Sequence, residues 1–237
     1  MHLIWWMQRE NPTWGAPRSS SELRLLGHDI GESPLSRYMK LVRDPQKAQH
    51  WSTFLRKHVK GLAACDFFVV PTVFFQRLFV LVVLSHDRRL IRRVAVTAHP
   101  TAKWAARQLC EAFLDKVPTQ LIHDNDGAFR GKFREQVEAM STIDMPITPG
   151  LWLQNAHCER VVGTLRRACT DHLIALNERH LLGKVREYVE AYYNVVRPHF
   201  RLERKAPVPR QRKATLATRV KATPVLGGLH HRYERAA

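Results

Sequence analysis

The sequence predicts an α/β protein in which helices flank one mixed sheet. Three apolar runs rich in β-branched and aromatic residues, 63–70, 77–84 and 89–97, are typical of buried strands. Shorter apolar runs at 119–123 and 143–148 alternate with helical patterns, so the predicted order is β-β-β-α-β-α-β-α-α. Hydrophobic residues fill 45% of the 237 positions, which is enough for one full domain with smaller pieces beside it.

A small polar and basic unit is predicted before this layer, over residues 1–44. One helical pattern ends at Gly27, and a second has Pro34 in its first turn. Two short helices around a tight turn are typical of a helix-turn-helix, although most helix pairs of this size do not bind DNA. The second helix carries Arg37 and Lys40, the candidate DNA contacts of this unit.

The remaining chain divides into three predicted parts. Residues 45–60 form a basic, helical connector, and residues 61–200 form the main domain, with helices from Pro100, over 131–140 and over 178–196. From residue 201 to 237 there are ten Lys or Arg against two Glu, together with three Pro. We therefore expect a basic, poorly ordered tail that faces nucleic acid.

The helix after Gln154 has the clearest pattern. Its apolar stripe repeats at three and four residues and consists of Cys158, Val161, Val162, Leu165, Cys169 and Leu173. Glu159 lies off this stripe and shares a face with Gly163 and Arg166. A small residue there allows a close approach of a DNA backbone, and the Arg one turn further is placed to hold a phosphate. Taken alone, Glu159 fits a solvated helix residue better than a functional one.

Charge and cysteine usage narrow the class of protein. Lys and Arg number 38 against 21 acids, a net charge of +17, which favours a polyanionic partner such as nucleic acid. The alternative is an Arg-rich composition without a specific partner. The four Cys contain no CxxC pair, which predicts reduced thiols in the cytoplasm. Pro71, Gln76 and Arg77 interrupt the longest apolar stretch, so no membrane span is expected.

Three separated carboxylates are the candidate catalytic and metal-binding groups: Asp66, Asp124 and Glu159. Asp66 stands inside an apolar strand, where a carboxylate is costly unless its charge is compensated. Asp124 ends the short apolar run 121–123, and Asp126 is its rival, although the position before Gly127 fits a turn residue better. Such carboxylates can hold divalent cations for phosphoryl-transfer chemistry.

The motifs around these acids resemble a known family. They are Ala64-Cys65-Asp66-Phe67-Phe68, Leu121-Ile122-His123-Asp124-Asn125-Asp126-Gly127 and Gln154-Asn155-Ala156-His157-Cys158-Glu159-Arg160. In this order and spacing they resemble the catalytic core of the DDE recombinases, which include retroviral integrases and bacterial insertion-sequence transposases. The segments 177–181 and 193–199 are similar to the part that closes the core in the bacterial enzymes.

The resemblance implies an RNase H-like fold and a DNA transposase or integrase that cuts and joins the ends of a mobile element. It also implies two Mg²⁺ (or Mn²⁺) ions at the three acids, both element ends and target DNA as partners, a homo-oligomer on DNA and the bacterial cytosol. The candidate DNA contacts of the core are Asn155, Arg160, Arg166 and Arg167. For the arginines, a solvated helix face is the alternative.

One segment departs from the family pattern. The loop before the Glu159 helix reads Pro149-Gly150-Leu151-Trp152-Leu153, without the basic and hydroxyl residues usual there. The alternative function is therefore a truncated or decayed copy that acts only as a non-catalytic DNA-binding protein. A simple RNase H-like nuclease is a third hypothesis, which the helix-turn-helix pattern and the basic tail disfavour.

Overall fold

The computed structural model describes residues 2–11, 14–42, 59–147, 155–209 and 220–235. The chain divides into two compact units, Met1–Lys57 and His58–Ala237, and each is described by itself. The division falls inside the stretch 45–60 that the sequence predicts as a connector. Most of that connector, and the loop 149–153, lie outside the described residues.

The described part of the first unit, residues 2–11 and 14–42, contains three helices: α1 (His2–Glu10), α2 (Ala16–Leu25) and α3 (Glu32–Val42). They enclose a small apolar core made of Ile4, Met7, Leu23, Leu35 and Met39. Between α2 and α3 the chain turns at Gly27, whose φ of +85° is a conformation that favours glycine. The sequence predicted the last two helices but not α1.

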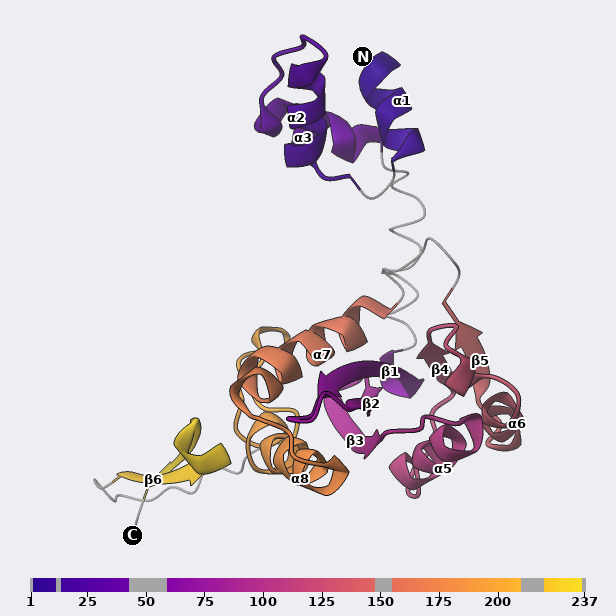
Figure 1. Ribbon diagram of the computed structural model, residues 1–237, viewed down its shortest axis with the longest axis vertical. Helices are drawn as coiled ribbons and strands as arrows, with labels where there is room; N and C mark the ends of the chain where they lie inside the picture. Colours follow the sequence, from indigo (N-terminus) through magenta and orange to yellow (C-terminus); the bar gives the residue numbers. More distant parts are fainter. Residues whose placement is uncertain (1, 12–13, 43–58, 148–154, 210–219, 236–237) are drawn as a thin grey trace. The chain divides into compact units, whose positions relative to one another are not determined.

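The second unit is built on a five-stranded sheet with the order β3-β2-β1-β4-β5 (Figure 1). Its strands are β1 (Leu62–Pro71), β2 (Arg77–Ser85), β3 (Leu90–Thr97), β4 (Gln120–His123) and β5 (Ile143–Pro146). The first three pair antiparallel, whereas β4 and β5 continue the sheet in parallel from β1. The predicted mixed sheet is confirmed.

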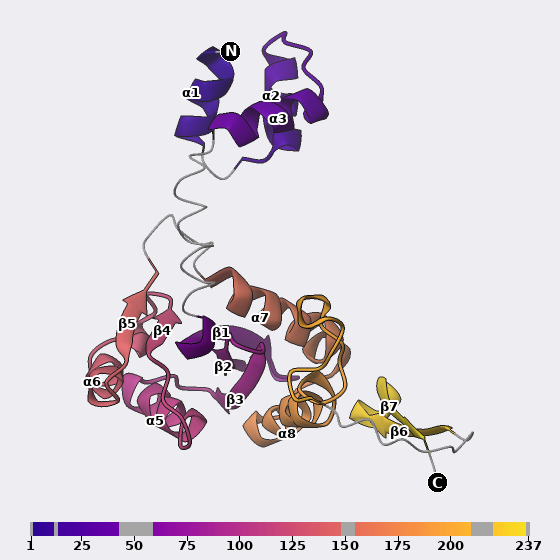
Figure 2. The same ribbon diagram turned by 180° about the vertical axis from the view of Figure 1, so that it is seen from behind.

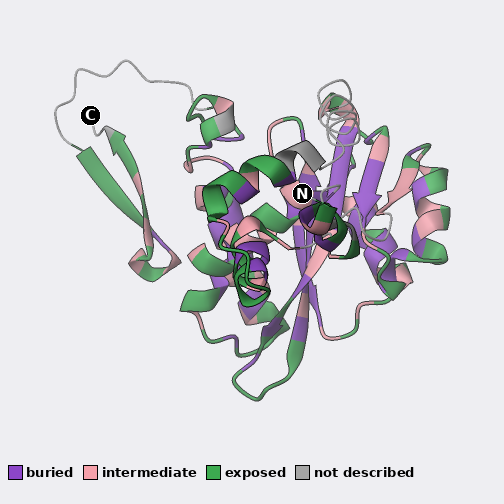
Figure 3. Ribbon diagram, turned by 90° about the horizontal axis from the view of Figure 1, so that it is seen from above, coloured by how far each residue is buried: buried purple, intermediate pink, exposed green. Residues whose placement is uncertain are grey.

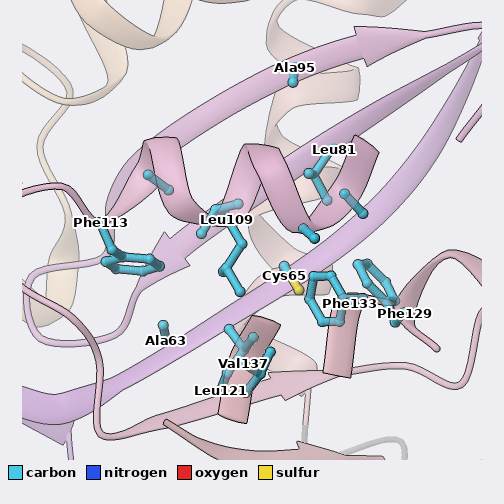
Figure 4. Close-up of a cluster of buried hydrophobic side chains, with 14 residues drawn as sticks. Ala63, Cys65, Leu81, Ala95, Leu109, Phe113, Leu121, Phe129, Phe133 and Val137 are labelled. Atoms are coloured by element: carbon cyan, nitrogen blue, oxygen red, sulfur yellow. The ribbon is translucent and has the colours of Figure 1, made fainter. Parts of the chain in front are cut away.

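Helices cover both faces of this sheet. Figures 1 and 2 show α5 (Ala102–Ala112) and α6 (Lys132–Ala139) on one face, and α7 (Ala156–Ala168) and α8 (Glu178–Tyr188) on the other. The strands are largely buried (Figure 3). Aromatic and aliphatic side chains fill the space between the sheet and α5 and α6 (Figure 4), including Leu81, Leu109, Leu121, Phe129 and Phe133.

Two helices end differently from the prediction. The apolar stripe predicted a helix continuing to Leu173, but α7 ends at Ala168 because Cys169 leaves helical geometry, and a 3₁₀ turn follows over Thr170–His172. The α8 helix continues into a single π-helical turn at Val189–Tyr193. Cys169 after α7, and Val189 and Tyr193 in the π-helical turn, stay buried although the backbone pattern changes, whereas Leu173 is only partly buried.

The C-terminal region differs from the predicted poorly ordered tail. Strands β6 (Val220–Val225) and β7 (His230–Arg235) form an antiparallel hairpin around Gly227 and Gly228, which have φ of +65° and +100°. His230 holds this hairpin to the domain, because its ring stacks on Tyr192 with centroids 4.4 Å apart. The high content of charge and proline led to the prediction of a poorly ordered tail. Both strands of a two-stranded ribbon are edge strands, however, and edge strands tolerate proline.

Candidate active site

Two of the predicted acids come from neighbouring parallel strands. The register pairs Ala63 with Leu121 and Ala64 with Ile122. Continued by two residues, the same register places Asp124 beside Asp66, and the alternation of side chains directs both to the same face. Ala63 and Cys65 belong to the core under α5 and α6, so Asp66 faces the α7 side of the sheet.

Asp66 is a half-buried carboxylate in a repulsive environment. One of its oxygens, Oδ1, accepts a hydrogen bond of 2.8 Å from the backbone N–H of Phe67. Burial, the charge of Asp124 and then that of Glu159 raise the pKa of Asp66 to about 7, although the Phe67 hydrogen bond and the charge of Arg166 oppose this. Strong perturbation by burial and like charge is typical of functional carboxylates.

Asp124 directly follows β4 and is tied to the next turn. Its Oδ1 accepts a hydrogen bond of 3.1 Å from the N–H of Asp126. Burial raises the pKa of Asp124, and the nearby charge of Asp126 adds to this. Asp126 itself accepts from the N–H of Ala128 and caps a short 3₁₀ turn. The rival acid is thus a turn residue, as its sequence position indicated.

A buried histidine supports Asp124 from behind. His123 is fully buried, and its Nδ1 lies 2.6 Å from the carbonyl oxygen of Asp124. Its Nε2 lies 2.6 Å from Asp144 Oδ1 on β5, and Arg134 approaches the other oxygen of Asp144 at 3.4 Å. Because a carbonyl only accepts, Nδ1 carries a proton. These polar contacts fix the end of β4, which Asp124 directly follows.

Sequence reasoning missed Asp144. Asp144 could have been found by the same pattern as Asp66, because it is a carboxylate inside a short predicted strand. Its partner His123 is 21 residues away, so only the parallel pairing of β4 and β5 brings the two together.

Glu159 lies in the first turn of α7 and is exposed. The opposite side of the helix, with Cys158, Val161 and Leu165, is buried against the sheet. A carboxylate in the first turn interacts favourably with the positive end of the helix dipole. Its charge acts on Asp66, so α7 brings the third acid close enough to interact with the first.

The donor chemistry of the three acids fits a hard divalent cation. Carboxylate oxygens are the ligands that Mg²⁺ uses, and a cation would relieve the repulsion that raises the pKa of Asp66. Within the described ranges, however, no three acidic, histidine or cysteine residues lie close enough together to hold one ion. The two aspartates are side by side, and Glu159 would complete the site only after a movement toward them.

Two predicted DNA contacts lie on the exposed face of α7. The guanidinium carbon of Arg166 lies 5.5 Å from the ring centre of Phe68 on β1, and its charge favours the ionised form of Asp66. The guanidinium of Arg167 lies against Gly163, where an added Cβ would be 3.1 Å from Nη1. The glycine predicted to admit a DNA backbone therefore has an arginine folded over it.

The other predicted DNA contacts lie in different surroundings. Arg37 is exposed on α3, and Lys40 belongs to the same helix. Asn155 precedes α7 and is only 1% exposed, so a direct contact with DNA there would require its uncovering. Arg160 is exposed and lines a cavity on the opposite side of α7 from Glu159.

Residues 144–207 match the integrase core domain. The matched segment spans β5, α7 and α8 and contains Glu159, whereas Asp66 and Asp124 precede it. The predicted resemblance to an integrase catalytic core is confirmed by this match. No curated protein matches the chain.

Several solved structures align with this chain. A chain of the simian T-cell lymphotropic virus intasome, in complex with the PP2A regulatory subunit B56 gamma, aligns with a TM-score of 0.52 at 12% identity, covering 73% of this chain. This chain spans 66% of the length of that relative. The HTLV-2 integrase catalytic core domain in complex with magnesium aligns with a TM-score of 0.47 at 14% identity, covering 59% of this chain and 88% of that chain. The catalytic core domain of BIV integrase aligns with a TM-score of 0.46 at 14% identity, covering 62% of this chain and 91% of that chain. The mixed α/β fold predicted from the sequence agrees with the fold of the aligned intasome chain. Among the described helices, none has the length and apolarity to cross a membrane.

Proposed function

We propose that this protein is a DDE transposase or integrase that cleaves DNA and joins the ends of a mobile element to a target. The observation that carries the proposal is the pair Asp66 and Asp124 on adjacent parallel strands, with Glu159 near enough to raise the pKa of Asp66. The match of residues 144–207 to the integrase core domain supports it.

In this mechanism the chain's own residues hold and orient the reacting groups. Two Mg²⁺ or Mn²⁺ ions at Asp66, Asp124 and Glu159 would supply activation of water or a 3′-hydroxyl and charge stabilisation for an in-line displacement at phosphorus. Asp66 must lose its proton to act as a ligand. His123 and Asp144 keep the backbone at Asp124 in place, and α7 carries Glu159 toward the two aspartates.

DNA is the proposed partner, because the net charge of +17 favours a polyanion. Exposed Arg166 and Arg167 lie on the helix that carries Glu159, and Arg37 and Lys40 lie on α3. Since two element ends must be joined, we also propose a homo-oligomer on DNA that acts in the cytoplasm. DNA affinity that does not change between low and physiological salt would contradict the DNA partner.

The test is strand transfer and nicking on DNA from the borders of the open reading frame, with Mg²⁺ or Mn²⁺. Asp66→Asn and Glu159→Gln should each abolish metal-dependent products while leaving DNA binding within a few-fold. Glu138→Gln on α6 is a matched control, because it removes an exposed helical carboxylate away from the site. Full strand transfer by Asp66→Asn would refute the assignment.

The second candidate is a DNA-binding protein without turnover. The specific observation in its favour is that, among described residues, no group of three potential ligands is assembled around one point. Titration with Mg²⁺ decides between the two. Saturable stabilisation that Glu159→Gln weakens supports the recombinase, whereas tight salt-sensitive DNA binding without any response to metal supports the second candidate.

A further inference from the structure

A small cavity lies beside α7, and none of the three acids lines it. Its volume is about 50 Å³, and its walls come from α7, from β2 and the turn after it, and from the segment that follows α8. A water molecule needs roughly 10–15 Å³ of such volume, so the cavity has room for a group of several heavy atoms. It is too small for a nucleoside.

Positive charge dominates the wall of this cavity. Arg89, Arg160 and Arg197 come from three separate elements and line it together. No acidic residue lines it among the described residues, and in the same part of the chain neither Arg160 nor Arg197 forms an ion pair with a carboxylate. Three arginines line one small cavity although like charges repel, which indicates a site for an anion.

Unsatisfied imidazoles give a second, independent indication. His199 lines the cavity, is 5% exposed, and its Nε2 has no hydrogen-bond partner among the described residues. His86 does not line the cavity, but its ring centre is 5.3 Å from that of His157, which does; it is 6% exposed, and neither of its ring nitrogens has a hydrogen-bond partner among the described residues. Buried polar atoms normally have partners, so the free Nε2 of His199 in the cavity wall marks a place where a ligand completes the hydrogen bonding.

The cavity is built on fixed backbone. Both polar atoms of the Asn194 side chain bind the backbone of Ile91. Its Oδ1 accepts from the N–H of Ile91 at 3.2 Å, and its Nδ2 donates to the carbonyl oxygen of Ile91 at 2.9 Å. Arg88 donates to the carbonyl oxygens of Pro207 at 2.6 Å and of Ala206 at 3.3 Å. The turn that carries Arg89 and the segment that carries Arg197 and His199 are thereby held together across more than 100 residues of sequence.

The cavity is separate from the candidate active site. At about 100° per residue, His157, Val161 and Thr164 point roughly 140–200° around α7 from Glu159. All three line the cavity, together with Leu84 of β2. One helix therefore presents Glu159 on one side and a wall of this cavity on the other.

We propose that this cavity is a binding site for one phosphate group, supplied either by a nucleic-acid backbone or by free phosphate. The guanidinium groups of Arg89, Arg160 and Arg197 donate to its oxygens, and the size of the cavity admits one such group. The site does not depend on the catalytic proposal, because none of the three acids takes part in it.

The first test is thermal unfolding of the full chain in EDTA with increasing inorganic phosphate, against chloride at equal ionic strength and pH. We expect a saturable rise in Tm with phosphate. Arg89→Gln and Arg197→Gln should each weaken the apparent affinity about tenfold or more, a loss typical of a charge-assisted hydrogen bond. Arg179→Gln removes the same charge from the exposed start of α8 and should leave the response unchanged.

The second test identifies the source of the phosphate by measuring duplex DNA affinity over a range of salt. If the backbone supplies it, the same two variants should reduce the slope of log K against log salt by about 0.9 for each lost contact. If the slopes are unchanged while phosphate protection is lost, the ligand is free phosphate. No saturable protection, or equal protection in Arg89→Gln and Arg197→Gln, overturns the proposal whether or not the protein cleaves DNA.

Discussion

Replacing Asp66 by Asn should stabilise the metal-free protein while destroying its proposed activity. The side chains have the same shape, and the Oδ1 of Asn can still accept the hydrogen bond from the N–H of Phe67. The substitution removes only the ability to carry a negative charge beside Asp124 and Glu159. It therefore isolates the free energy of ionising this carboxyl in the folded state.

The magnitude follows from the pKa. The pKa of Asp66 rises from 3.8 to about 7 on folding, so the folded chain binds this proton more tightly than the unfolded chain. Each unit corresponds to about 1.4 kcal/mol, so the upper limit is about 4 kcal/mol, and partial access to water reduces it to about 2 kcal/mol. The free-energy cost of ionising Asp66 is absent below the unfolded pKa, grows as the pH rises through this interval, and is constant above the folded pKa.

The assay is urea unfolding with EDTA at several values between pH 4 and pH 8, comparing wild type with Asp66→Asn. Subtracting the two curves cancels the histidines, the acids that do not interact with Asp66, and the N-terminal unit. We expect the variant to be more stable by about 2 kcal/mol at pH 8, with the difference disappearing toward pH 4. Adding Mg²⁺ should stabilise the wild type and not the variant.

Two results would refute this reasoning. A variant that is less stable than wild type at pH 8 would mean that the carboxylate makes a net favourable interaction in the folded state. A difference that does not change with pH would mean that Asp66 has an ordinary pKa, so that the repulsion among the three acids is absent in solution.

Three further predictions concern the surroundings of α7. Burial, with a smaller contribution from the charges of His157 and Arg89, lowers the pKa of His86 to about 3. The stability of the folded protein should therefore fall as the pH drops from 6.5 toward 3. His86→Phe should remove about 2 kcal/mol of this loss at pH 5, measured by urea unfolding in phosphate-free buffer. Asn194→Ala should cost about 2–3 kcal/mol, because two backbone groups of Ile91 lose their partner, and Asn194→Asp should restore only the bond to the N–H. Gly163→Ala should raise the stability of α7 by about 1 kcal/mol and displace Arg167, with weaker DNA binding in fluorescence anisotropy; unchanged binding would exclude Arg167 in its present position as a DNA contact.

The sheet and its carboxylate could be predicted because their signals are local. Long β-branched and aromatic runs identify buried strands, and Asp66 is visible as the charged residue that interrupts one of them. Glu159 is visible because it lies off a regular apolar stripe. In each case the pattern within a dozen residues already contains the physical reason.

The rest depends on pairing between distant segments. The contact of Arg88 with Pro207 joins residues 119 apart, and His86 meets His157 only because α7 crosses β2. Nothing near His86 in the sequence distinguishes it from a solvated turn residue. The C-terminal hairpin was missed for a related reason, because its charges and its proline outweighed the turn formed by Gly227 and Gly228.

Charged groups on both sides of α7 argue for ligands of opposite sign. On one side, Asp66 has a carboxylate whose ionisation the fold opposes, and only a cation would reverse that cost. On the other side, guanidinium groups and the bare Nε2 of His199 call for an anion. Leaving His199 Nε2 without a partner costs about 1–3 kcal/mol, a cost that an anion in the cavity would offset. Because α7 contributes Glu159 to one proposed site and Arg160 to the other, a substitution that shifts this helix should change the response to Mg²⁺ and the response to phosphate together.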